Sequence, residues 1–177
     1  IILSDKNAGQ FKAPIPSLLA VSGLHHHLIR RGTRMRASII LESGEPREVH
    51  HFASLIGYGA DGINPYLAYE AIDMIIKEGL VKDISLEDAV ERYRHAETKG
   101  IIKVMSKMGI STVQSYRGAQ IFEALGISQS VIDKYFTGTV TRIGGLEIQH
   151  IEKEALTRCK NAFGASSKAK ALKSGGE

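Results

Sequence analysis

The sequence predicts an α/β protein whose parallel strands alternate with helices, like a partial or degenerate (β/α) barrel with extra helices. Three short apolar segments, residues 1–3, 37–41 and 62–64, are each followed by polar residues and then by a segment with helical spacing. Strands separated by helices favour a parallel sheet with right-handed crossovers. With 177 residues, 43% of them hydrophobic, the chain can form one domain with its own core.

The first three helices are predicted from apolar spacing. In residues 17–31, Leu18, Val21, Leu24 and Leu28 recur three and four positions apart, which places them on one face of a helix. Residues 47–56 and 66–78 follow the second and third strands and read as further helices. These three strand–helix pairs give the order βαβαβα.

A helical insert is expected next. Ser85 with acidic residues in the turn that follows it is typical of a capped helix start. We expect that helix to run past Tyr93, to break at Gly100, and to be followed by a second helix over residues 101–107.

Residues 109–126 are predicted to form a fourth strand–helix unit. β-branched Thr112 and Val113 indicate a strand over residues 111–116. Gly118 would turn the chain into a helix over residues 119–125. This unit would either present polar groups to a ligand or be an ordinary polar turn.

The end of the chain is predicted to be helical around a glycine-rich loop. Ser128 would cap a short helix, residues 137–146 would form the loop, and residues 147–163 would form an amphipathic helix. We therefore expect a domain over residues 1–163. Residues 164–177 read as a linker or disordered tail.

Polar residues at the strand ends are the candidate site. Parallel strands would bring them to one edge of the sheet, where α/β proteins bind ligands. Simple polarity of strand ends explains them equally well. The candidates, with Ser4 and Lys6 beside them, are Asp5, Glu42, Ser43, Asn64, Gln114, Ser115 and Arg117.

Two arginines belong to this set of candidates for different reasons. Arg117 at a strand end needs a partner if it is buried, and we expect Glu42, Asp5 or a group from an adjoining domain. Arg142 lies in the glycine-rich loop, which could bind an anion, dock a partner or simply connect two helices. No spacing indicates an acid–base pair or a nucleophile with its histidine, so no catalytic residue is assigned.

Several site types are disfavoured. Gly57-Tyr58-Gly59-Ala60-Asp61-Gly62 has dinucleotide-motif spacing, but a helix precedes it and a strand follows, the reverse of the required order. Residues 25–27 are all histidine, but successive helical side chains point in different directions and cannot share one metal. Cys159, the single cysteine, excludes a disulfide or a four-cysteine metal site within the chain and reads as a buried thiol.

Composition narrows the partners and the compartment. The chain has 23 Lys and Arg against 19 Asp and Glu, a net charge of +4, and no basic run interleaved with aromatics, which disfavours nucleic acid. No apolar run approaches the roughly 20 residues of a membrane span. A reducing, cytoplasmic setting is expected. The chain opens on an apolar segment without Met, so we expect a piece of a longer polypeptide.

Segments along nearly the whole chain, up to about residue 163, resemble the large subunit of glutamate synthase, and specifically its central domain. They occur in the same order as in that family. They are residues 2–5, 15–21, 25–30, 50–53, 57–61, 64–68, 103–111, 109–126, 135–139 and 142–145.

The resemblance implies a domain between a glutamine amidotransferase and an FMN-binding barrel, itself described as a degenerate relative of that barrel. Members of the family are oxidoreductases that make glutamate from glutamine and 2-oxoglutarate in nitrogen assimilation. In them, ammonia passes through an internal tunnel. This chain would connect the two domains and help to line the tunnel without catalysing a reaction itself. FMN and the iron–sulfur cluster would belong to the adjoining domain. The alternative is a regulatory domain that binds an anion or another small molecule.

Overall fold

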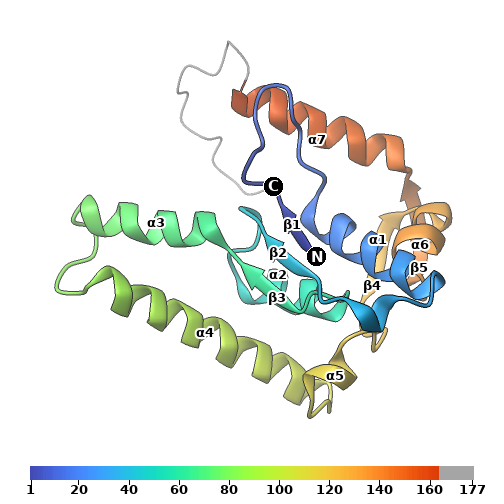
Figure 1. Ribbon diagram of the computed structural model, residues 1–177, viewed down its shortest axis with the longest axis horizontal. Helices are drawn as coiled ribbons and strands as arrows, with labels where there is room; N and C mark the ends of the chain where they lie inside the picture. The colour runs from blue at the N-terminus through green and yellow to red at the C-terminus, as the bar shows by residue number, and fades with distance from the viewer. Residues whose placement is uncertain (164–177) are drawn as a thin grey trace.

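The computed structural model describes residues 1–163. In that part of the chain, seven α-helices, a 3₁₀ helix and five strands form an open α/β structure with two small parallel sheets (Figure 1). In chain order they are β1 (Ile2–Ser4), α1 (Ser17–Arg30), η1 (Arg34–Arg36), β2 (Ile40–Glu42), α2 (Val49–Gly57), β3 (Gly62–Asn64), α3 (Tyr66–Lys77), α4 (Leu86–Lys107), α5 (Val113–Tyr116), β4 (Glu123–Ile127), α6 (Gln129–Tyr135), β5 (Val140–Leu146) and α7 (Ile148–Phe163). The predicted partial α/β architecture is confirmed, and the described strands close no barrel.

The first sheet is three-stranded and parallel in the order β1-β2-β3. Ile2 pairs with Ile40, which pairs in turn with Gly62, so the three strands end level with one another. The sequence therefore predicted all three strands and their direction correctly. The third strand and the helix after it begin at the predicted residues.

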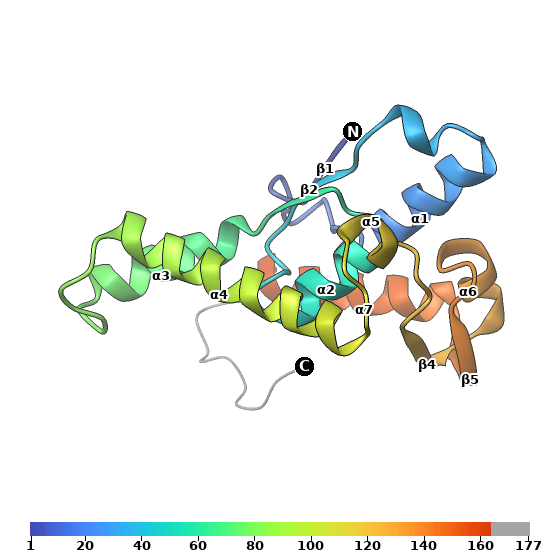
Figure 2. The same ribbon diagram turned by 90° about the horizontal axis from the view of Figure 1, so that it is seen from below.

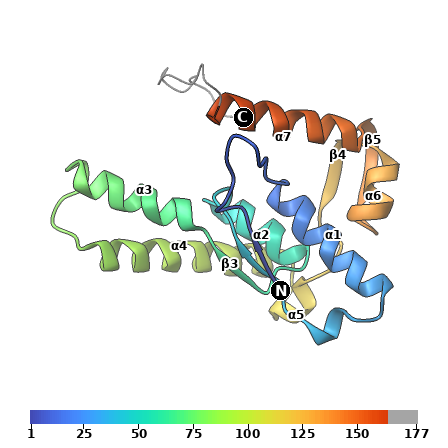
Figure 3. The same ribbon diagram turned by 45° about the horizontal axis from the view of Figure 1, so that its top comes forward.

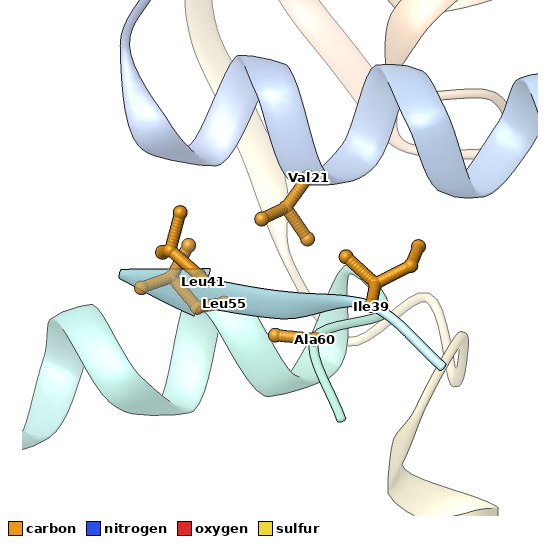
Figure 4. Packing of buried hydrophobic residues seen from close by; sticks show 5 residues of the cluster. All are labelled: Val21, Ile39, Leu41, Leu55 and Ala60. Carbon is orange, nitrogen blue, oxygen red and sulfur yellow. The ribbon is translucent and has the colours of Figure 1, made fainter. Parts of the chain in front are cut away.

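The main core lies around β2. Val21 and Ile39 are fully buried, and Leu41 and Leu55 are each 3% exposed. Figure 4 shows β2 running between α1 and α2, with Val21 of α1 pointing toward the strand. Apolar side chains from both helices thus cover the central strand, as parallel sheets require.

Helices α3 and α4 form a hairpin that projects from the body (Figure 3). Ser85 caps α4 as predicted, because its hydroxyl accepts a hydrogen bond from the Asp88 amide at 3.1 Å. The predicted break at Gly100 is wrong, since α4 runs unbroken through it. A Cβ on Gly100 would collide with the Val49 side chain of α2, so glycine here permits close packing of the two helices.

The prediction for residues 109–126 is wrong in both halves. Residues 113–116 form the short helix α5 instead of a strand, with Thr112 as its cap. Residues 123–127 form β4 instead of a helix. Between them Gly118 and Gln120 take positive φ values of 75° and 56°, which turn the chain. Figure 2 shows α5 beside α2, away from the β4–β5 pair.

Strands β4 and β5 form a separate two-stranded parallel sheet beside α6 (Figure 2). Val131 and Ile132 of α6 pack against Ala124 and Ile127 of β4 and against α1 and α7. The predicted glycine-rich loop over residues 137–146 is therefore wrong for residues 140–146, which are strand. The predicted tail, 164–177, lies outside the described residues. Within residues 1–163, no helix combines the length and apolar character that a membrane crossing demands.

Candidate functional site

The carboxyl edge of the three-stranded sheet gathers the predicted polar residues around Glu42. Ser4 Oγ donates a hydrogen bond to Glu42 Oε2 at 2.7 Å, and Asn64 Nδ2 donates to Glu42 Oε1 at 3.3 Å. Lys6 Nζ lies 3.8 Å from the same carboxylate. Level parallel strands bring these side chains together, as the sequence predicted.

A second group at this edge holds the loops that follow the strands. Asp5 accepts hydrogen bonds from Ser43 Oγ at 2.5 Å and from the Gly44 amide at 3.2 Å. Glu45 accepts from the amide of Ser17 at 2.8 Å and from its hydroxyl, and so satisfies the start of α1. These acids are engaged by serines and amides, which gives them a structural role.

A cleft of about 610 Å³ opens between this edge and α7. Its walls are mainly apolar, and its charged groups are Asp5, Glu45, Arg47 and Arg158. Cys159 is buried at its α7 side, where the thiol lies 3.3 Å from the Gly9 carbonyl oxygen. This contact agrees with the prediction of a buried structural thiol.

Gln114, Ser115 and Arg117 do not join the carboxyl edge, because they belong to α5 and its end. Gln114 and Ser115 are exposed. Arg117 Nη1 binds Asp61 Oδ1 at 2.5 Å. Asp61 directly precedes β3, so Arg117 lies at the amino edge of the sheet, and the expected pairing with Glu42 or Asp5 is wrong.

Asp61 is the centre of a compact polar network at that amino edge. Its Oδ2 accepts hydrogen bonds from the Ile39 amide at 2.7 Å and from Arg34 Nη2 at 2.8 Å. Burial alone would raise the pKa of Asp61. The bonds from Ile39 and Arg34, with the charges of Arg117 and Arg34, outweigh burial and lower the pKa. The carboxylate therefore stays ionised and ties α5 to the sheet.

Arg34 extends the network to helix α1. Its Nε donates to His25 Nδ1 at 2.9 Å, and its other nitrogens donate to the carbonyls of Ala37 and Gly59. Burial, followed by the neighbouring His26 imidazole and the charges of Arg34 and Arg117, lowers the pKa of His25 to about 4. His25 is therefore neutral at pH 7, as its role of acceptor toward Arg34 requires.

A smaller cavity of about 200 Å³, here called the His25 cavity, lies between α1, the end of α2 and the chain after α5. Its polar lining consists of neutral groups. Burial lowers the pKa of His26 and raises the pKa values of Tyr58 and Tyr116. The polar residues that line it are His25, His26, Tyr58, Tyr116, Gln120, Thr137 and Thr139.

Tyr116 fixes this part of the chain. Its side chain is fully buried, and its hydroxyl donates to the Ala53 carbonyl of α2 at 3.0 Å. Gly118 donates its amide to the Gly57 carbonyl at 2.8 Å. Because residues 111–116 were predicted as a strand, the packing of α5 against α2 was not expected from the sequence.

Arg142 joins neither edge of the three-stranded sheet. It lies on β5 and forms a surface ion pair with Glu123 of β4. Its Nη1 is 2.6 Å from Glu123 Oε1, and its side chain is 72% exposed. Because residues 140–146 are a strand, their backbone is committed to pairing with β4. An anion-binding loop at this position is therefore not formed.

Sequence reasoning missed Asp61, Arg34 and His25 as a unit. The contact that joins them is visible only in the structure: Gly59 has φ +113°, and a Cβ there would lie 2.6 Å from His25 Cγ. The three residues are far apart in the sequence, so no local pattern linked them. Within residues 1–163, no group of three or more His, Cys, Asp or Glu side chains is arranged to hold a metal.

Comparison with known proteins identifies the family. The family described as "Glutamate synthase central domain" matches residues 1–128. The chain is 62% identical over 163 residues to the glutamate synthase [NADPH] large chain of Bacillus subtilis, covering 92% of this chain and 11% of that protein. It is 48% identical over 164 residues to the glutamate synthase [NADH] of Saccharomyces cerevisiae, covering 89% of this chain and 8% of that protein.

A third relative is a ferredoxin-dependent glutamate synthase by name. The chain is 42% identical over 174 residues to the ferredoxin-dependent glutamate synthase of Pyropia yezoensis, covering 92% of this chain and 11% of that protein. The chain thus spans about a tenth of the length of the curated relatives that it matches. This chain belongs to the glutamate synthase central domain family.

Proposed function

We propose that this chain serves as the central domain of a glutamate synthase large chain, connecting the amidotransferase and FMN-binding domains without catalysing a reaction itself. The observation that carries the proposal is the family match over residues 1–128, with 62% identity to a large chain that is about eight times as long. The whole enzyme would make glutamate from glutamine and 2-oxoglutarate in nitrogen assimilation. The proposal includes a cytoplasmic setting.

The redox groups of the enzyme would be held by other parts of the large chain. An iron–sulfur cluster needs several thiolate ligands, and this sequence contains one cysteine, which is buried against the Gly9 carbonyl. FMN would bind in the adjoining barrel. A preparation of the 177-residue chain is expected to show no flavin absorbance and to release no ammonia from glutamine, and either signal would contradict the proposal.

The finer part of the proposal is that the His25 cavity contributes to the path of ammonia. Ammonia must stay unprotonated to react, so its path should lack acids that would hold it as ammonium. His25, with a pKa of about 4, stays neutral, and burial keeps Tyr58 in its neutral form. The remaining polar lining is the imidazole of His26, whose pKa burial lowers, together with hydroxyl and amide groups, which suits a small neutral guest.

The test places a carboxylate in the cavity of the complete enzyme. Gln120→Glu changes one cavity-lining amide into an acid of nearly the same shape. Gln114→Glu makes the same change on α5 and is the matched control, because Gln114 is exposed like Gln120 but does not line the cavity. The measurement is the glutamate formed from 2-oxoglutarate per glutamine hydrolysed, with released ammonia assayed in parallel.

The expected result is a several-fold loss of coupling in Gln120→Glu, with glutamine hydrolysis retained and free ammonia rising. Gln114→Glu should remain coupled. Equal coupling in both variants would remove the His25 cavity from the path, while leaving the connecting role untouched.

A second candidate function is binding of an anionic small molecule in the 610 Å³ cleft. The observation that favours it is the presence of Arg47 in a cleft whose two acids are already hydrogen-bonded to serines. A dicarboxylate such as 2-oxoglutarate should then raise the Tm of the protein, and Arg47→Ala should reduce that rise. An unchanged Tm at millimolar ligand would exclude this function.

A further inference from the structure

The β4–β5 sheet carries an exposed apolar face. Leu125 and Ile143 are register partners, so they lie side by side on the same face of the sheet. They are 68% and 62% exposed, and Val140 of β5, the register partner of Glu123, is 48% exposed. These three residues are here called the β4–β5 face.

The opposite side of the pair is packed. Ala124 and Ile127 contact the cluster formed by Val131, Ile132 and Phe136 of α6 and its end. In the part of the chain that the structure describes, β4 and β5 pair only with each other, so each has an open edge. Parallel sheets are ordinarily covered on both faces, and an isolated pair of strands is marginal in water.

We propose that the β4–β5 face is covered by an apolar surface of the large chain outside these 177 residues. This inference rests on the proposed function, because it takes the chain to be one part of that polypeptide. The similar large chain of Bacillus subtilis is about eight times as long, so ample polypeptide is available in the same molecule. The occupant is a surface with apolar side chains and, beside Glu123 and Arg142, charged groups at its margin.

The position of the sheet relative to the family match supports this occupant. The match ends at residue 128, directly after β4, whereas β5 lies beyond it. Similarity to the Bacillus subtilis large chain nevertheless covers 92% of this chain. The sheet therefore joins the central domain to the polypeptide beyond that match, and this is where an intramolecular contact would form.

The experiment uses the complete large chain and substitutes the face. Leu125→Lys with Ile143→Lys places two charges on it. The matched control, Met35→Lys with Leu80→Lys, changes two apolar residues that are 97% and 71% exposed and lie on η1 and the α3–α4 hairpin. Amide hydrogen exchange over residues 140–146, Tm and molecular mass by light scattering are measured for each.

The expected result is slow exchange over residues 140–146 in the parent and at least tenfold faster exchange in the double variant. The Tm of the double variant should fall, while its molecular mass should equal that of the parent. The control variant should match the parent in exchange, Tm and mass. Fast exchange in the parent, or equal exchange in both variants, would overturn the proposal. A halved mass in the double variant would also overturn it, because the face would then join two copies.

A milder variant tests the proposal even if the double variant fails to fold. Ile143→Thr keeps a β-branched side chain and should raise exchange over residues 140–146 less than the double variant does. Unchanged exchange with this variant, together with loss of folding in the double variant, would contradict the proposal. Coupling in Gln120→Glu is measured independently, so failure of the ammonia proposal and failure of this surface are distinguishable.

Discussion

The two sheets differ in what surrounds them, although both are parallel. Strand β2 has only three residues, yet it runs between α1 and α2 with Leu41 3% exposed (Figure 4). Strand β5 has seven residues, and most of them are exposed. The two sheets therefore differ in how far their faces are buried, and strand length does not explain the difference. Helices cover the first sheet, whereas one face of the second is exposed.

The charged groups beside the two sheets also differ, in the number of partners that each carboxylate has. Asp61 beside the first sheet accepts from Ile39 and Arg34 and pairs with Arg117, within a network that reaches His25. Glu123 in the second sheet has one ion-pair partner, Arg142, at the surface. Polar groups at the first sheet are thus expected to support the fold, whereas those at the second leave the fold largely unaffected.

The largest expected effect is on the core of the first sheet. Leu41→Ala should lower the free energy of unfolding by about 2–5 kcal/mol, because it leaves a cavity beside β2. Leu125→Ala removes the same atoms from an exposed site and should cost within about 0.5 kcal/mol. Urea denaturation of both variants measures the difference, and similar losses would refute the contrast.

The second prediction concerns the network at the amino edge. Asp61→Asn should destabilise by about 3 kcal/mol, because Arg34 and Arg117 lose their shared carboxylate in a site where the Asp61 side chain is 18% exposed. The control Asp73→Asn breaks the i,i+4 pair with Lys77 on exposed α3 and should cost at most about 0.5 kcal/mol. A small loss for Asp61→Asn would show that the two arginines find other partners.

The third prediction is a pH dependence of stability. The pKa of His25 is about 4 in the folded protein, below its ordinary 6.5, chiefly because the side chain is buried. Between these values the unfolded chain binds more protons than the folded one. Stability should therefore rise with pH from 4 to 6.5 and fall by about 1–3 kcal/mol on acidification through that window.

The matched variant for this effect is His25→Asn, which can offer an acceptor oxygen to Arg34 without titrating. Its unfolding free energy should vary less between pH 4.5 and 7 than that of the parent. An equally steep profile in the variant would assign the pH dependence to other groups.

The sequence predicted the first sheet well because its signals are local. Each short apolar segment is followed by polar residues and a helix, and Ser85 precedes two acids at the start of α4. Parallel pairing then brings Asp5, Glu42, Ser43 and Asn64 to one edge without further information. Their placement was therefore predictable, although their binding role stays a prediction.

The second region was mispredicted because its structure depends on distant contacts. Thr112 and Val113 favour a strand by propensity, but Thr112 caps α5 and the buried Tyr116 holds it on α2. Ile121, Phe122 and Leu125 have helical spacing, yet Phe122 stacks on Tyr58 and Leu125 pairs beside Ile143. Such pairings carry no local signal, so Gln114, Ser115 and Arg117 were placed at the wrong edge.

The smallest expected effect is on the ion pair of the open sheet. Arg142→Gln in the 177-residue chain should change the free energy of unfolding by about 0–1 kcal/mol, because the side chain is 72% exposed and water and salt screen the pair. The difference from the parent should shrink further in 0.5 M salt. Urea denaturation at both salt concentrations measures it.

This small effect sharpens the comparison, because the pair is 2.6 Å long and yet is expected to contribute little. A short distance alone does not make an ion pair stabilising; removal from water and additional hydrogen bonds, as at Asp61, do. In the complete large chain, coverage of the β4–β5 face would bury the margin where Arg142 lies, and the same variant should then cost more than it does in the 177-residue chain. A loss above about 2 kcal/mol already in the shorter chain would mean that the second sheet is as enclosed as the first, and the contrast between them would fail.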